Sequence, residues 1–137
     1  MAQTSTEVLL RTITVIEAAA FRTGQVVRQI LAEHPQLTAS TGHAALSATI
    51  YSDGEYSANM PRFEVGVDNT AALVWAEALG GDSEWTTRDH GSFVYESTRF
   101  TVVIDGVEIA VCGGRSLTDD EAAAWRAAGD QGEGGEG

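Results

Sequence analysis

The segment between residues 84 and 112 constrains the fold more than any other part of the sequence. Apolar residues alternate with polar ones there, which predicts strands at Glu84–Arg88, Phe93–Ile104 and Val107–Cys112. A turn at residues 89–92 and an Asp105-Gly106 pair separate the strands, and Asp-Gly readily adopts the positive φ of a tight hairpin. Because tight turns join consecutive strands, this block predicts a three-stranded antiparallel meander.

A shorter hairpin is predicted earlier in the chain. Residues 46–51 alternate between apolar and polar, and an Asp53-Gly54 turn follows them. The return strand is expected over residues 63–67, after Pro61, which lacks a backbone donor and belongs at an edge or bulge. Residues 36–43 are small, polar and without a pattern, so we expect a loop there.

A long helix is predicted at the N-terminus, from about Thr6 to Glu33. Pro35 ends it, and Gly24 favours a kink or break near its middle. Spacings of four and three residues place one set of side chains on a single stripe. The stripe consists of Leu9, Ile13, Ile16, Ala20, Thr23, Val27 and Ile30. We expect this stripe to pack on the sheet.

Two further helices carry clear end signals. Asp68 is a predicted N-cap for a helix over Asn69–Leu79, and Gly80-Gly81 provides its C-terminal stop. Thr118 and Glu121 form a capping box that opens a short third helix. The predicted architecture is therefore α+β.

The predicted fold is a single domain over residues 1–128. An antiparallel sheet, made of the hairpin and the meander, is packed on one face by the long N-terminal helix and the central helix. Residues 129–137 are rich in glycine and acidic side chains and cannot bury apolar surface, so a disordered tail is expected there.

Net charge is the most informative feature of the composition. The 137 residues hold 20 acidic side chains against 8 basic ones, a formal net charge of −12. Residues 1–52 are neutral overall, whereas residues 53–108 carry eleven acids against three arginines. Nucleic-acid binding needs a cationic face to contact phosphates, so a direct nucleic-acid partner is not expected.

The sequence predicts a cytoplasmic protein without a membrane partner. No apolar run approaches the roughly 18 residues that a membrane span needs, and the N-terminus lacks a signal-peptide pattern. A single cysteine, Cys112, cannot form an internal disulfide, which fits a reducing compartment.

No catalytic or metal-binding signature is found. Nucleophilic chemistry would have to draw on Cys112, His34, His43, His90 and Ser92, and none lies in a known nucleophile motif. The densest clusters of ligating residue types are Asp89-His90 and residues 119–121, which turn and capping geometry already explain. A weak surface cation site and a paired-carboxylate hydrolase stay open as alternatives. We therefore predict a protein that is not an enzyme, with no catalytic, cofactor or metal residues.

One resemblance can be named. The runs AALVWAEALGGDSEW and FVYESTRFTVVIDGVEIAVCGGR, followed by a capped acidic helix, resemble small uncharacterised proteins of high-G+C actinobacteria and their phages. The resemblance covers about residues 70–128. It implies no known activity, and it fits an accessory role on a mobile element.

These observations predict a small acidic interaction protein that binds a basic surface of a protein partner. A phage or mobile-element inhibitor that mimics nucleic-acid charge is the sharpest form of this hypothesis. The acids would supply attraction, and exposed aromatic side chains would supply specificity. The predicted interaction residues are Asp53, Glu55, Asp82, Glu84, Trp85, Asp89, Tyr95, Glu96, Asp105 and Glu108.

Two alternative functions remain. A ligand-binding protein or hydrolase would have its site between the helices and the sheet, in a deep pocket lined by Trp75, Trp85 or His90. A self-associating module would use the stripe from Leu9 to Ile30 or an open sheet edge. The oligomeric state is accordingly left as monomer or homodimer.

Overall fold

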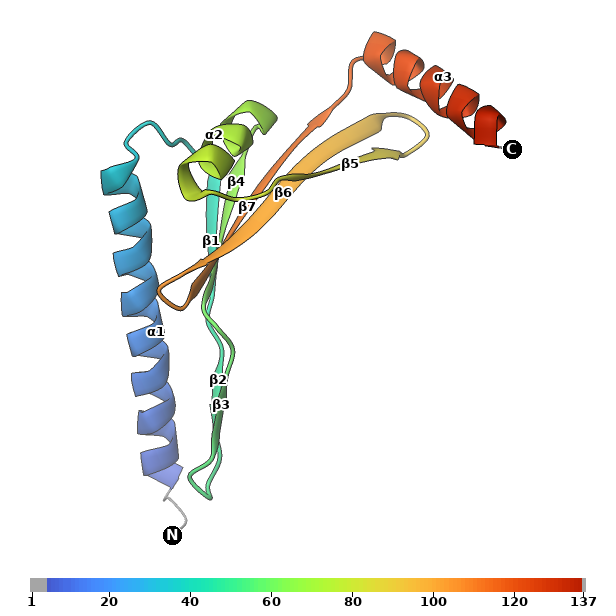
Figure 1. Ribbon diagram of the computed structural model, residues 1–137. Helices are drawn as coiled ribbons and strands as arrows, with labels where there is room; N and C mark the ends of the chain where they lie inside the picture. The colour runs from blue at the N-terminus through green and yellow to red at the C-terminus, as the bar shows by residue number, and fades with distance from the viewer. Residues whose placement is uncertain (1–4, 137) are drawn as a thin grey trace.

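The computed structural model describes residues 5–136 and contains three helices and seven strands in that range. In chain order these are α1 (Ser5–Glu33), β1 (Thr41–Ala45), β2 (Ala48–Ile50), β3 (Tyr56–Ala58), β4 (Arg62–Val67), α2 (Asn69–Leu79), β5 (Glu84–Asp89), β6 (Val94–Ile104), β7 (Val107–Ser116) and α3 (Asp119–Glu136). Figure 1 shows them as a sheet with α1 and α2 on one side and α3 projecting from its end. The predicted α+β class with a long N-terminal helix is confirmed.

The main sheet has the strand order β1-β4-β7-β6-β5, and β2 and β3 form a separate two-stranded ribbon. Neighbouring strands are antiparallel except β4 and β7, which run parallel, with Val65 opposite Val111. The expectation of a wholly antiparallel sheet is therefore wrong at this pair. Parallel neighbours need a long crossover, and α2 with the β5–β6 hairpin supplies it. Local turn signals cannot reveal which distant strands become neighbours.

The meander lies where the sequence predicts it. The β6–β7 register runs from Tyr95 opposite Ser116 to Ile104 opposite Val107. At the turn between them, Asp105 has φ 48° and Gly106 has φ 79°, the left-handed values expected for a tight Asp-Gly hairpin.

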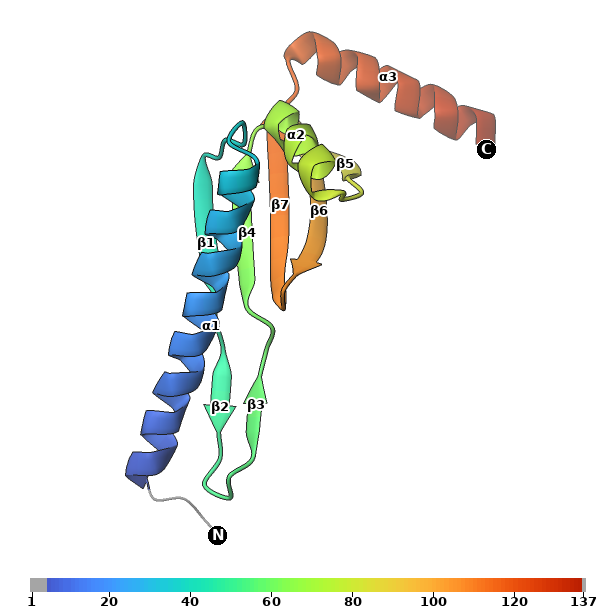
Figure 2. The ribbon, with the colours of Figure 1, turned by 60° about the vertical axis from the view of Figure 1, so that its left-hand side comes forward.

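The first hairpin differs from its prediction because it is divided in two. Its base, β1 with β4, belongs to the main sheet, whereas β2 and β3 extend below it along α1 (Figures 1 and 2). Residues 41–43, expected in a loop, begin β1. Backbone pairing with β4 makes them a strand, and the sequence TGHAA shows no apolar–polar alternation.

The core lies between the sheet and the two helices that cover one face (Figure 2). Val65 and Val111 from the parallel pair are buried beneath Val26 of α1 and Trp75 of α2. Asp68 caps α2 as predicted, because its Oδ1 accepts the Ala71 backbone N–H at 2.7 Å. The two helices therefore stabilise the sheet from one side only.

The buried stripe of α1 is not the predicted one in the N-terminal half. Thr23 and Ile30 are buried as expected, but Leu9 is 64% exposed and Ile13 is 54% exposed. The lower half of α1 runs beside only the narrow ribbon, which cannot cover a full helix face (Figure 1). The helix also continues through Gly24 without the break that the glycine suggested.

α3 begins at the predicted capping box. Thr118 Oγ1 accepts the Glu121 backbone N–H at 3.2 Å, and a Glu121 carboxylate oxygen accepts the Thr118 backbone N–H at 3.0 Å. The helix extends to Glu136 and so includes residues 129–136 of the expected tail. That the tail is disordered stays a prediction, as does the single-domain boundary at residue 128.

The contact between α2 and β7 gives the first testable prediction. A Cβ on Gly113 would lie 3.1 Å from the Asp68 carbonyl oxygen and 3.2 Å from Ala72 Cβ. Gly113→Val should therefore push α2 off the sheet and lower the free energy of unfolding by about 1–3 kcal/mol. Urea denaturation measures this. Gly129→Ala is the control, because a Cβ there meets no atom outside its own helix within 4 Å, and this helix-interior change should raise the free energy of unfolding by up to about 1 kcal/mol. An unchanged midpoint for Gly113→Val would contradict the close packing.

Candidate functional site

Two adjoining hollows lie between α1 and β1, and we call them together the α1–β1 groove. The lower hollow has a volume of about 300 Å³ and is lined by Ala20, Thr23, Gly24, Val27, Arg28, Ala44, Leu46 and Phe63. The upper hollow has a volume of about 290 Å³ and is lined by Val27, Leu31, Ala39, Ser40, Thr41, Gly42, Phe63, Val65 and Trp75. Val27 and Phe63 belong to both hollows, so the groove is continuous along β1.

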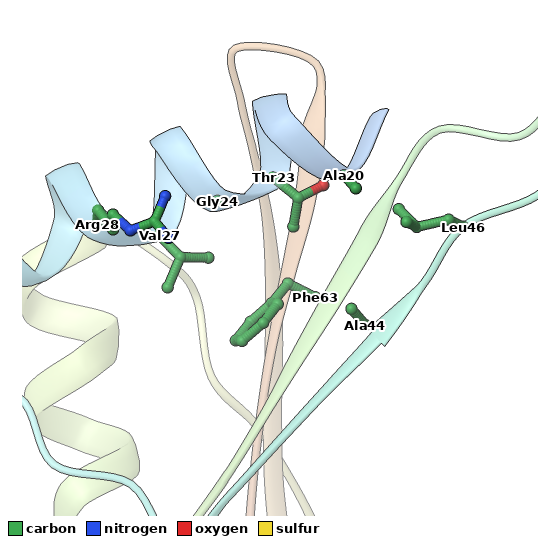
Figure 3. Close-up of a pocket in the computed structure, with 8 residues that line it drawn as sticks. All are labelled: Ala20, Thr23, Gly24, Val27, Arg28, Ala44, Leu46 and Phe63. Atoms are coloured by element: carbon green, nitrogen blue, oxygen red, sulfur yellow. The ribbon is translucent and has the colours of Figure 1, made fainter. Parts of the chain in front are cut away.

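The groove exists because β1 carries small side chains where it faces the helix layer. Gly42 and Ala44 lie on that side of β1, opposite Val65 and Phe63 of β4. The Phe63 ring covers Gly42, because a Cβ on this glycine would lie 3.3 Å from Phe63 Cζ. In Figure 3, Thr23 and Val27 project from α1 toward Phe63, and Ala44 and Leu46 line the other side. The result is an apolar trough with an aromatic floor.

Beside this trough, β1 forms an edge of the sheet. All five of its residues are exposed, and within the described residues no strand pairs with its outer side. Exposed edges are usually protected by charged residues, proline or a bulge. β5, at the opposite edge, carries Glu84, Arg88 and Asp89, whereas β1 has the sequence TGHAA and an unbroken register with β4. The backbone of β1 is thus open to a further strand.

The upper end of the groove is held in place by Trp75. This side chain is 3% exposed, and its Nε1 donates a hydrogen bond to the Thr38 carbonyl at 2.8 Å. Leu37 is also buried in the core, so the connection from α1 to β1 is tied down by two side chains. The groove is therefore formed before any ligand arrives.

Arg28 is the charged residue at the groove. Its side chain lies back along α1, where a Cβ built on Gly24 would come within 3.1 Å of Arg28 Nη1. Elsewhere in the described chain, Arg62, Arg115 and Arg126 all form ion pairs with carboxylates. Arg28 is exposed and, like Arg22, Arg88 and Arg99, has no ion pair within residues 5–136, and its guanidinium lies along α1 beside the lower hollow.

The ten predicted interaction residues do not gather on one face. Asp53 and Glu55 lie at the tip of the ribbon, and Asp82 precedes β5. The strand registers place Glu84, Tyr95 and Glu108 on the face away from the helices. Trp85, Asp89 and Glu96 face the helix side, and Asp105 lies in the β6–β7 turn.

Several of these acids already have partners within the molecule. Asp89 pairs with Arg126 at 2.8 Å, Glu96 lies 3.4 Å from the Arg115 guanidinium, and Glu108 pairs with Arg62. Asp53 accepts the backbone N–H of Glu55 at 2.9 Å and so stabilises its own turn. These four carboxylates make contacts within the folded chain. Glu55, Asp82, Glu84 and Asp105, by contrast, show no ion pair in the described region.

The residues considered for nucleophilic or metal chemistry lie on different elements. His34 follows α1, His43 is on β1, and Cys112 is on β7, while His90 and Ser92 lie in the β5–β6 turn. His90 stacks on Phe93 with ring centroids 4.8 Å apart. Among the described residues, no group of three His, Cys, Asp or Glu side chains is placed to hold a metal ion. Of the aromatic residues expected to line a ligand pocket, Trp75 lies at the groove, whereas Trp85 and His90 do not.

Across residues 5–136, no helix combines the length and the apolarity needed to cross a bilayer.

Comparison with protein-family models, with curated proteins and with solved structures gives no significant match. Function is therefore inferred from the geometry of the α1–β1 groove and from the charge distribution.

Sequence reasoning missed this groove. Two signals pointed to it: the run TGHAA, which lacks Asp, Glu, Lys and Arg, and the positions Gly24 and Leu31 of α1, which lie beside Ala20 and Val27 of the predicted stripe. The first falls partly in the predicted loop. On α1, the buried residues Thr23, Val26 and Ile30 each lie one position before Gly24, Val27 and Leu31. A one-residue step turns a helix by about 100°, so these three positions lie at the side of the buried face.

The Asp89–Arg126 pair gives a prediction about pH. The guanidinium of Arg126 and the backbone N–H of Gly91 lower the pKa of Asp89 to about 2. Because the folded pKa is depressed, the contact of α3 with β5 is fully present above pH ~4, the pKa of an unperturbed Asp, and is lost as the pH falls through 2. Arg126→Gln should move the pKa of Asp89 back toward its usual range, which carboxyl NMR titration measures.

The control for this titration is Glu121, on the same helix. Arg115 and the capping box hold its pKa at about 2 without Arg126, so Arg126→Gln should leave it in place. If Asp89 titrates identically in both proteins, the ion pair is not the cause of its low pKa.

Proposed function

We propose that this chain is a non-enzymatic interaction protein that captures an extended segment of a protein partner at the α1–β1 groove. The segment would add to the sheet as a strand beside β1, a recurrent mode of peptide recognition. The observation that carries this proposal is an unpaired edge strand, free of Asp, Glu, Lys and Arg, running along a preformed apolar trough. Backbone hydrogen bonds would provide affinity, and the hollows would select side chains.

The spacing of the hollows supports strand addition. Gly42 lines the upper hollow and Ala44 the lower one, and both face the helix layer. Side chains two residues apart on a strand point the same way and are separated by roughly 6.7 Å. An added strand would therefore direct two alternate side chains into the two hollows. The proposed ligand carries large apolar residues at these two positions.

The same geometry argues against a second copy of β1 as the occupant. A symmetric antiparallel pair of β1 strands would place Ala44 of one copy opposite Gly42 of the other. The side chains that the second copy offers, the hydrogen of Gly42 and the methyl group of Ala44, are too small to fill the hollows. Unfilled apolar volume loses packing energy. A segment with bulky apolar side chains is the better complement.

The basic partner expected from composition remains part of the proposal. The net charge of −12 attracts cationic proteins at long range and raises association rates. Glu55, Asp82, Glu84 and Asp105 are available for this role because no internal ion pair occupies them in the described chain. We propose that charge speeds the encounter with a basic protein and that the groove then holds one segment of it.

A matched pair of alanines tests the binding mode. Ala44 faces the lower hollow, and its neighbour Ala45, on the same exposed strand, faces the opposite side of the sheet. Ala44→Phe should fill the hollow and weaken the binding of peptides selected from a random nonapeptide display library by at least about tenfold, a loss of ~1.4 kcal/mol. Fluorescence polarisation of the labelled peptides measures the affinity.

Ala45→Phe serves as the control and should bind the same peptides within about twofold. Hydrogen exchange of the complex should show new protection across β1. Equal affinity for the two variants, or protection confined to another region, would refute capture at this groove.

A further inference from the structure

The lower hollow carries a feature that apolar capture does not explain, namely the guanidinium of Arg28. We infer that the captured segment carries a carboxylate beside its apolar side chains and that Arg28 binds this carboxylate. This inference rests on the proposed capture of an extended segment at the groove. Arg28 is thereby a specificity-determining residue of the α1–β1 groove, which recognises an acidic apolar motif.

The local charge supports this inference. Of all the residues that line the two hollows, Arg28 is the one with a formal charge. Helix neighbours at three and four positions are those that reach a side chain, and Arg28 has Gly24, Gln25, Leu31 and Ala32 there. Arg11, by contrast, has Glu7 four residues before it. The α1 helix therefore provides no carboxylate for Arg28.

Gly24 supports the same assignment. A glycine inside a helix lowers its stability, and α1 nevertheless runs straight through this position. Without a Cβ at residue 24, the Arg28 side chain folds back along the helix beside the lower hollow. Figure 3 shows Arg28 and Val27 together on α1, across the hollow from Leu46. Gly24 thus gives the guanidinium room next to the apolar trough.

The chemistry of arginine defines the ligand class. A guanidinium offers a planar fork of N–H donors that matches a carboxylate in bidentate geometry, and such charge-assisted pairs are stronger than neutral hydrogen bonds. Arg28 is exposed in this structure, so a segment bound in the groove would have to cover the guanidinium in part before the loss of water strengthens the pair. The carboxylate can belong to an Asp or Glu side chain or to the C-terminus of the segment, and both sources present the same group.

The experiment uses peptides selected on the wild-type full chain, each synthesised in four matched forms. One form keeps the selected acidic side chain, and one replaces it by its amide; the other two carry a free or an amidated C-terminus. We expect the loss of one carboxylate to weaken binding about tenfold, and the form that shows this loss identifies the source. Fluorescence polarisation measures each affinity.

Variants of the protein, measured with the same four peptide forms, test the contact from the side of Arg28. Arg28→Gln should bind the carboxylate and amide forms equally, at the affinity that the wild type shows for the amide form. Arg28→Lys should retain part of the preference, because it keeps the charge and loses the fork. Arg22→Gln is the matched control, since Arg22 lies on the other flank of α1, in a separate hollow with Ser47 and Pro61.

The outcomes separate the two proposals. If Ala44→Phe abolishes binding but Arg28→Gln keeps the wild-type preference for the carboxylate, the inference about Arg28 is overturned and capture at the groove stands. If all four peptide forms bind the wild type equally, the inference is likewise overturned. If Ala44→Phe and Ala45→Phe bind equally well, capture fails, and the role of Arg28 fails with it.

Discussion

The parallel pairing of β4 with β7 is the contact on which the rest of the structure depends. It aligns Val65 with Val111 beneath Val26 and Trp75, and so joins the N-terminal hairpin to the meander through one buried core. It also determines which strand is left at the edge. Because β7 takes one side of β4, β1 takes the other and has no strand on its outer side in the described chain.

The position of α1 then turns this edge into a groove. Thr23, Val26 and Ile30 anchor the helix on the sheet, which leaves the next stripe of the helix facing β1 across Phe63. Gly42 and Ala44 are too small to close the gap. Burial of one apolar stripe thus exposes a second one, since the sheet is too narrow under α1 to cover both.

Charge has two separate roles in this molecule. Arginines neutralise particular carboxylates where elements meet, as Arg62 does for Glu64 and Glu108 between β4 and β7, and as Arg126 does for Asp89 between α3 and β5. Exposed pairs of this kind add little to stability and mainly fix geometry. The remaining excess of negative charge acts at a distance, while the groove carries one positive group.

The sequence by itself determined the elements whose signals are local: the Asp105-Gly106 hairpin, the Asp68 cap, the box of Thr118 with Glu121, and the α+β class. These follow from neighbouring residues, whose geometry is set within a few bonds. Only the tertiary structure decided the β4–β7 pair, which stripe of α1 is buried, and the α1–β1 groove. Each of these depends on residues far apart in the chain. A five-residue strand such as β1 forms one side of a groove only because a helix and a strand pack beside it.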